Sequence, residues 1–195
     1  MRVIAGKFRS RTLQSLPGDD TRPTYDRLKE TLFNVLAAAG KLDGAVFFDL
    51  FAGTGAIGIE ALSRGATKAY FVESAKKAAQ VIRANLQALQ LEECAEVHER
   101  SVADALRLLA EAGLKADIIF LDPPYKMQGA YEQVLRIVAQ SPLLSDSGVL
   151  VAEHEKRFDP GDGLGTLKRY RRLDQGDSSL SFYRINAGQG DAEPK

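Results

Sequence analysis

The chain has 195 residues, 45% of them hydrophobic, and its formal net charge is zero. These values fit one globular domain with an ordinary core. No apolar run approaches the roughly 20 residues that cross a bilayer, and the start of the chain lacks the apolar region of a signal peptide. The sequence therefore predicts a cytoplasmic protein. The only cysteine is Cys94 and the two histidines lie far apart, so we expect no disulfide and no metal site.

The neutral total hides an uneven distribution of charge. Residues 1–41 contain eight Lys and Arg against four Asp and Glu, a net of +4, so the remainder carries −4. The first twelve residues have four basic side chains and no acidic one: Arg2, Lys7, Arg9 and Arg11. Basic N-terminal segments often contact polyanions, which makes these four cations candidate RNA-binding residues. A solvated surface tail would show the same charges.

The N-terminal part predicts a small arm followed by a helix. Residues 1–20 mix basic and apolar side chains and turn at 17–20, which predicts two short strands in a hairpin-like arm over residues 1–22. Apolar positions then recur at helical spacing up to residue 39. They predict a helix of about 15 residues that Gly40 ends, with Thr24 as its N-cap.

From residue 45 onward, strands and helices alternate. We expect strands at 46–50, 69–72, 96–99, 117–121 and 148–153, and helices at 56–63, 74–89 (capped by Ser74), 102–112 and 131–139. Such alternation predicts an α/β fold, a parallel sheet with helices on both faces. A closing pair of strands is expected at 168–173 and 180–185, which completes a domain over residues 23–186. The polar residues 187–195 predict a disordered tail.

Three glycines between the first strand and the first helix of this alternation form a candidate cofactor loop. Gly53, Gly55 and Gly58 match G-x-G-x-x-G in the required context. Glu73 ends the next strand, 20 residues after Gly53, where a carboxylate can hold two ribose hydroxyls. The pattern favours a nucleotide-like cofactor over a purely structural glycine turn.

The identity of the cofactor follows from the charge beside the loop. A dinucleotide needs its pyrophosphate at the helix N-terminus, but Asp49 would repel phosphate and pair with an ammonium group. This favours S-adenosylmethionine, which has no phosphate. Asp49 and the backbone of Gly53 and Gly55 would surround its methionine end and Glu73 its ribose. Residues 101–102 would border its adenine, although a helix N-cap explains Ser101 equally well.

A second candidate site is Asp122-Pro123-Pro124-Tyr125, at the end of the strand predicted at 117–121. Two prolines stop a sheet and make a stiff corner, and ligands of open α/β sheets gather at this end of the strands. A plain surface turn is the alternative. Beside a methyl donor, Asp122 and the Pro123 carbonyl could accept both N–H groups of an exocyclic amine. They would thereby direct its lone pair and stabilise its developing charge, while Tyr125 stacks on an unpaired base.

Several segments resemble the RsmD family of bacterial methyltransferases. They are residues 1–7, Arg22-Pro23-Thr24 with Asp26-Arg27, 32–34, 49–55, 60–66, 71–73 and 122–125, in the same order and spacing. The resemblance implies a seven-stranded class I methyltransferase sheet with an N-terminal arm near RNA. It also implies methylation of the N2 amine of one guanine, of the guanine-966 type, in 16S rRNA of an assembled or partly assembled small ribosomal subunit. S-adenosylhomocysteine would be the product, and no feature argues for a stable oligomer.

The motifs and the resemblance together give a predicted set of site residues. The catalytic residues are Asp122, Pro123, Pro124 and Tyr125. The cofactor-binding residues are Arg22, Thr24, Asp49, Phe51, Ala52, Gly53, Thr54, Gly55, Glu73, Ser74, Ser101 and Val102. Three alternative functions stay open at this point: an adenine-N6 methyltransferase on DNA or RNA, which uses the same corner, a dinucleotide-dependent reductase, and a non-catalytic rRNA-binding assembly factor.

Overall fold

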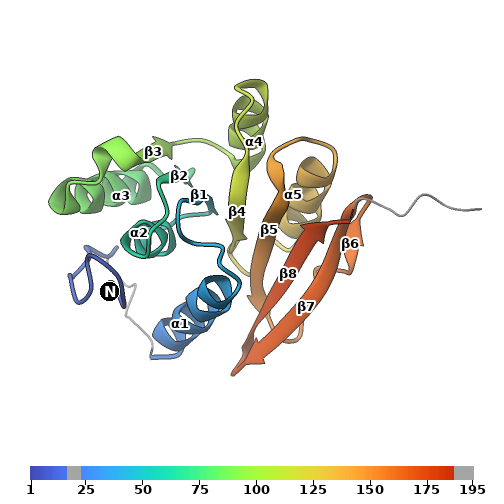
Figure 1. Ribbon diagram of the computed structural model, residues 1–195, viewed down its shortest axis with the longest axis horizontal. Coiled ribbons are helices and arrows are strands. Elements are labelled where there is room, and N and C mark those ends of the chain that lie inside the picture. The colour runs from blue at the N-terminus through green and yellow to red at the C-terminus, as the bar shows by residue number, and fades with distance from the viewer. Residues whose placement is uncertain (17–22, 187–195) are drawn as a thin grey trace, which may run out of the picture.

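The computed structural model describes residues 1–16 and 23–186, which contain one mixed sheet of eight strands (Figure 1). The strands are β1 Val46–Leu50, β2 Lys68–Val72, β3 Ala95–His98, β4 Ala116–Leu121, β5 Leu144–Glu155, β6 Gly163–Leu164, β7 Leu167–Gln175 and β8 Ser178–Ile185. They lie in the order β3-β2-β1-β4-β5-β8-β7-β6. The first five in this order pair in parallel, and the last three join them antiparallel.

Helices cover both faces of the sheet, as the alternation predicts. They are α1 Pro23–Ala38, α2 Ala56–Ser63, α3 Lys76–Leu89, α4 Val102–Glu111 and α5 Gly129–Ala139, with a 3₁₀ turn at Glu92–Cys94. Apolar residues of α1, α2 and α3 form one core cluster with one face of the sheet, and those of α4 and α5 form a second with the other face. The central strands β1 and β4 are therefore buried on both sides, which explains why each is apolar except for one aspartate.

The chain order of the strands creates a switch point between β1 and β4. From β1 the chain proceeds outward to β2 and β3, and it then returns to place β4 on the other side of β1. Loops that leave β1 and β4 at their carboxyl ends therefore diverge to opposite faces, and a crevice opens between them. The glycine loop (residues 51–55) and the Asp-Pro-Pro-Tyr segment (residues 122–125) both begin at this edge.

Several predicted boundaries differ from the structure. Helix α1 begins at Pro23, so Thr24 lies inside the first turn rather than at the cap; proline suits the first helical position because the N–H it lacks would have no partner there. The capping prediction for Ser74 is wrong, because Ala75 is the cap residue of α3 and makes no side-chain cap bond. Strand β5 is longer than expected. The sheet also has an eighth strand, because Gly163–Leu164 pair back onto β7.

The N-terminal arm has one isolated bridge, between Arg2 and Thr12, instead of the two predicted strands. Residues 1–3 bond across the arm to residues 10–13, but the pairing stops there because the backbone groups of residues 4, 5, 7 and 8 bond to α2 instead. Ile4 and Ala5 donate their N–H groups to the Glu60 carboxylate, at 2.7 and 2.9 Å. Further bonds join residues 5, 7 and 8 of the arm to Ser63: its hydroxyl donates to the Ala5 carbonyl and accepts from Phe8 N, and its carbonyl accepts from Lys7 N.

Glycine at position 6 allows this close contact between the arm and α2. Gly6 has a φ of +82°, and a Cβ atom there would lie 1.9 Å from the Ser63 carbonyl oxygen. Val3 and Leu13 enter the same core cluster as α1 and α2. The described part of the arm, residues 1–16, is thus packed on the domain, and its basic side chains Arg2, Lys7, Arg9 and Arg11 stay exposed.

Some predictions fall outside the part of the chain that the structure describes. These are the turn at 17–20, the cofactor residue Arg22 and the tail at 187–195. Within residues 1–16 and 23–186, no helix is long and apolar enough to cross a membrane, and no group of three or more His, Cys, Asp or Glu side chains is placed to hold a metal ion.

Candidate active site

A cavity of about 450 Å³ opens at the carboxyl edge of the sheet, within the usual size of small-molecule sites. It is lined by the glycine loop, the residues after β2, the Asp-Pro-Pro-Tyr segment and the end of β5, and we call it the site cavity. The lining residues are Phe51, Gly53, Glu73, Ser74, Asp122, Pro123, Pro124, Tyr125, Met127 and Glu153. Gly53 and Asp122, far apart in sequence, thus face one shared space.

The glycine loop is held in a tight conformation beneath the cavity. Phe51 adopts a φ of +61°, which costs a non-glycine residue on the order of 1–3 kcal/mol. Gly58 packs against Phe71 of β2, since a Cβ atom at Gly58 would lie 2.3 Å from the ring. The third glycine of the motif therefore serves helix–strand packing. The first one, Gly53, has no atom near the position of an added Cβ and keeps the backbone open to a ligand.

Glu73 braces this loop from the end of β2. Its Oε2 accepts the Gly53 N–H at 2.9 Å, and its Oε1 accepts the Ala75 N–H at 2.7 Å. Each carboxylate oxygen has a second lone pair, so two ribose hydroxyls can still donate to it. Glu73 is therefore placed to accept hydrogen bonds from the ribose of the predicted cofactor. Its bonds to the Gly53 and Ala75 N–H groups fix its position.

Asp49 lies beneath the loop and does not line the site cavity. It is 1% exposed, and its Oδ2 accepts the Gly58 N–H at 2.8 Å. Burial raises the pKa of Asp49 to about 8, against the opposing effect of that hydrogen bond. The structure places Asp49 in direct contact with the start of α2.

The Asp-Pro-Pro-Tyr segment leaves β4 as a rigid turn. The Pro124 carbonyl accepts the Met127 N–H at 2.7 Å, and Tyr125 projects with 59% of its surface exposed. The Asp122 carboxyl is closely surrounded by protein while part of the residue faces the cavity, and this burial raises its pKa to about 7. Among the described residues, neither the Asp122 carboxylate nor the Pro123 carbonyl has a hydrogen-bond donor. Both acceptors are available to a substrate.

Glu153 is a site residue that the sequence interpretation missed. Leu121 of β4 pairs with Ala152 of β5, so Asp122 and Glu153 occupy the next positions on neighbouring strands and face the same cavity. Burial, and then the negative charge of Asp122, raise the pKa of Glu153 well above its usual range. The available signal was an acid ending an apolar strand beside the strand that carries Asp122.

Other predicted cofactor residues have structural contacts away from the lining. Ala52, Thr54 and Gly55 belong to the loop but do not line the cavity, and the Thr54 hydroxyl donates to the Met1 sulfur at 3.3 Å. Ser101 is the N-cap of α4 and accepts the Asp104 N–H. Val102 begins that helix. The side chain of Thr24 lies outside the described part of the structure.

Comparison with known proteins identifies the family. The family model described as conserved hypothetical protein 95 matches residues 1–184. The chain belongs to the RsmD family. One RsmD relative, ribosomal RNA small subunit methyltransferase D of Haemophilus influenzae, is 39% identical over 95% of this chain and 92% of its own. The Bacillus subtilis protein YlbH is 38% identical over 94% of this chain and 98% of its own.

The solved structures agree with this membership. The Escherichia coli protein yhhF superposes with a TM-score of 0.83 at 29% identity, over 96% of this chain and 99% of that one. This RsmD-family chain therefore has the class I methyltransferase fold expected from its sequence, with the eighth strand as an addition.

Proposed function

We propose that this RsmD-family protein transfers a methyl group from S-adenosylmethionine to the exocyclic N2 amine of a guanine in 16S rRNA, of the guanine-966 type. The observation that carries the proposal is the site cavity, where the glycine loop meets the Asp122 carboxylate and the Pro123 carbonyl, neither of which bonds to a described residue. The Haemophilus relative is named a ribosomal RNA small subunit methyltransferase, which supports rRNA as the substrate. A small ribosomal subunit, assembled or in assembly, is the proposed partner of the monomer.

The charges that line the site cavity fit S-adenosylmethionine better than a dinucleotide. Its described lining contains three carboxylates, Glu73, Asp122 and Glu153, and no Lys or Arg. Glu73 and the ionised forms of Asp122 and Glu153 would repel a pyrophosphate, whereas a cationic sulfonium and an ammonium group are attracted to them and favour those ionised forms. When bound, S-adenosylmethionine supplies an electrophilic methyl group and leaves as S-adenosylhomocysteine.

The residues of the protein then orient the amine, stabilise its developing charge and hold the base that carries it. Asp122 and the Pro123 carbonyl accept its two N–H bonds and so turn the nitrogen lone pair toward the methyl group. The rigid proline turn holds this direction, and orientation of this kind is a large part of rate enhancement. The Asp122 carboxylate also stabilises the positive charge that grows on nitrogen and accepts the departing proton. Tyr125, exposed beside the cavity, stacks on the flipped base.

The decisive experiment identifies the methylated nucleoside that the protein produces. Small subunits isolated without the modification are incubated with the protein and labelled S-adenosylmethionine, and the digested rRNA is analysed by mass spectrometry of its nucleosides. We expect N2-methylguanosine at one site. Methyladenosine as the only product, or transfer only to duplex DNA, would overturn the proposal. In calorimetry, binding of NADH without binding of S-adenosylmethionine would favour the reductase.

We also propose that the exposed cations of the arm contact rRNA phosphates. Arg9 and Arg11 are exposed and form no ion pair with any described residue, while the arm is bonded to α2 directly beyond the glycine loop. Replacing both by Ala is expected to weaken binding to small subunits and to reduce the slope of log K against log salt by about one to two units. Filter binding at several salt concentrations measures this slope, and an unchanged slope would remove these phosphate contacts from the proposal.

A further inference from the structure

Two carboxylates in the site cavity have no partner among the described residues, although the mechanism uses only one of them. Glu153 is 9% exposed, and within the described residues no hydrogen bond or ion pair involves the carboxylate of Glu153 or that of Asp122. The other deeply buried acids, Asp49 and Glu60, each accept backbone N–H groups. Burial of a carboxylate without donors is costly, so Glu153 marks a place where a ligand can supply a donor.

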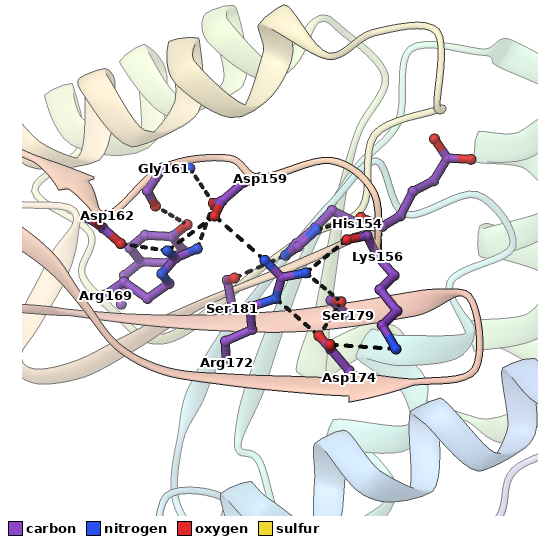
Figure 2. Close-up of polar contacts among 12 residues, drawn as sticks. His154, Lys156, Asp159, Gly161, Asp162, Arg169, Arg172, Asp174, Ser179 and Ser181 are labelled. Carbon is purple, nitrogen blue, oxygen red and sulfur yellow. Dashed lines mark hydrogen bonds and ion pairs between the residues drawn. The ribbon is translucent and has the colours of Figure 1, made fainter.

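The backbone that carries Glu153 is fixed on both sides. The Tyr131 hydroxyl donates to the Glu153 carbonyl at 2.7 Å. Figure 2 shows the next residue, His154, in contact with Ser181 of β8; its Nε2 lies 2.9 Å from the Ser181 hydroxyl. Lys156 lies one residue past β5, and its carbonyl accepts a hydrogen bond from Arg172 at 2.9 Å (Figure 2). This end of β5 is therefore pinned to its neighbours, and the Glu153 side chain starts from a fixed position, as a specific binding group requires.

Guanine and adenine differ in what they would present to these acceptors. The relevant edge of guanine carries three N–H donors, two on N2 and one on N1. Adenine carries two donors on N6, and its N1 is an acceptor. Three acceptors in the cavity lining have no hydrogen bond to any described residue and lie beside the proposed methyl acceptor: the Asp122 carboxylate, the Pro123 carbonyl and the Glu153 carboxylate. Three acceptors match three donors, while adenine would bring a lone pair against one of them.

We propose that Glu153, in its ionised form, accepts the N1–H of the target guanine and thereby selects guanine over bases whose N1 is an acceptor. This inference rests on the proposed function, because Asp122 and Pro123 are taken to hold the N2 amine. Discrimination of this kind can be large, since a site that hydrogen-bonds a substrate N–H rejects analogues that lack it by up to about 10⁴–10⁵-fold. It also explains how a segment shared with adenine methyltransferases could serve guanine: the distinction would come from β5, outside that segment.

The test uses 2-aminopurine, which has the 2-amine of guanine but an unprotonated N1. Small subunits are reconstituted with 16S rRNA that carries either guanine or 2-aminopurine at the mapped target position, and kcat/KM for methyl transfer is measured for both at alkaline pH, where Glu153 is ionised. For the wild-type protein we expect a guanine preference of at least about 10²-fold. Glu153→Gln can offer an amide N–H to the N1 of 2-aminopurine, so we expect that preference to fall about tenfold or more.

Glu155→Gln is the matched control. Glu155 lies two residues further along the same strand, is exposed and does not line the site cavity. The Glu155→Gln variant should therefore prefer guanine over 2-aminopurine as strongly as the wild type does. If the wild type methylates both bases equally well, or if Glu153→Gln keeps the wild-type preference, the inference is overturned while guanine-N2 methylation stands. If the wild type makes no N2-methylguanosine, the proposed function itself has failed. The wild-type comparison alone decides the matter if Glu153→Gln does not fold.

Discussion

Substitution of Asp122 by Asn is expected to lower kcat for methyl transfer by about 10³-fold, within the range seen when a positioned acid–base or charge-stabilising group is lost. The amide has nearly the same size, so the turn after β4 should persist. It lacks the negative charge that stabilises the reacting nitrogen, and it cannot accept the proton. Single-turnover assays on small subunits, with saturating S-adenosylmethionine, measure the rate of the chemical step. Asp146→Asn, at an exposed acid on β5, is the control and should keep full activity.

The same variant should be more stable than the wild type at alkaline pH. Burial raises the pKa of Asp122 from 3.8 to about 7, so the folded state holds a proton that the unfolded state has lost. Stability therefore falls as pH rises from about 4 to 7, by at most about 4 kcal/mol. Asp122→Asn removes this penalty. We expect its Tm to rise by about 3 °C or more at pH 8 and to change little at pH 4.

These two readouts separate chemistry from structure. Wild-type activity should increase with pH toward about 7, because the ionised Asp122 is the active form. If Asp122→Asn retains wild-type activity, Asp122 has no catalytic role, and the non-catalytic assembly factor becomes the better account. If Asp122→Asn loses activity together with several degrees of Tm at pH 8, the carboxylate is a structural group and the loss of rate carries no mechanistic meaning.

Replacement of Glu60 by Ala is expected to destabilise the protein by about 3–5 kcal/mol, a fall in Tm of about 10 °C. The Glu60 and Lys29 side chains are both fully buried, with Lys29 Nζ 3.7 Å from Glu60 Oε2. Glu60 also accepts the Arg64 Nε–H at 2.7 Å. Burial lowers the pKa of Lys29, and Glu60 opposes that change. Removal of the acid leaves a buried ammonium group and releases two backbone donors of the arm.

Thermal unfolding followed by circular dichroism measures this loss. Glu30→Ala, on the exposed side of α1 next to Lys29, is the control and should stay within about 0.5 kcal/mol of the wild type. Protection of the Ile4 and Ala5 amides in hydrogen exchange gives a second, local readout, which should disappear in Glu60→Ala. Retention of both the Tm and the amide protection would show that the arm is held by its apolar contacts alone.

The parts of the protein that could be predicted from sequence are those with a local signal. The order of strands and helices from Val46 to Leu121 follows from hydrophobic periodicity, and Gly53 with Asp122 follows from motifs at strand ends. The hairpin-like arm was predicted only in part: residues 1–3 bond to residues 10–13, but the bonds of residues 4–8 to α2 were not expected. The Glu60 side chain that bonds to it lies more than 50 residues away in the sequence.

The cap of α3 was predicted wrongly and Glu153 was missed for related reasons. Ser74 has the residue type of a cap, but Glu73 already bonds to the Ala75 N–H from two residues earlier. The local preference for Ser74 as the cap was overridden by its neighbour Glu73, which also bonds to Gly53 at the cavity. Glu153 has no motif at all, and its importance depends on the pairing of β5 with β4. Strand register is a tertiary property that an acid at the end of an apolar run does not reveal.

Helix α2 joins the glycine loop, where the cofactor is proposed to bind, to the N-terminal arm, which is proposed to contact rRNA. Its first residues follow the glycine loop, its last turn holds the arm, and all eight of its residues are buried. At about 1.5 Å per residue it is only about 12 Å long. A rigid element of this length cannot tilt at one end without moving the other. If rRNA binding shifts the arm and α2 with it, the cofactor loop shifts too, and thermodynamic reciprocity then requires that each of the two ligands alters the affinity of the other by the same factor.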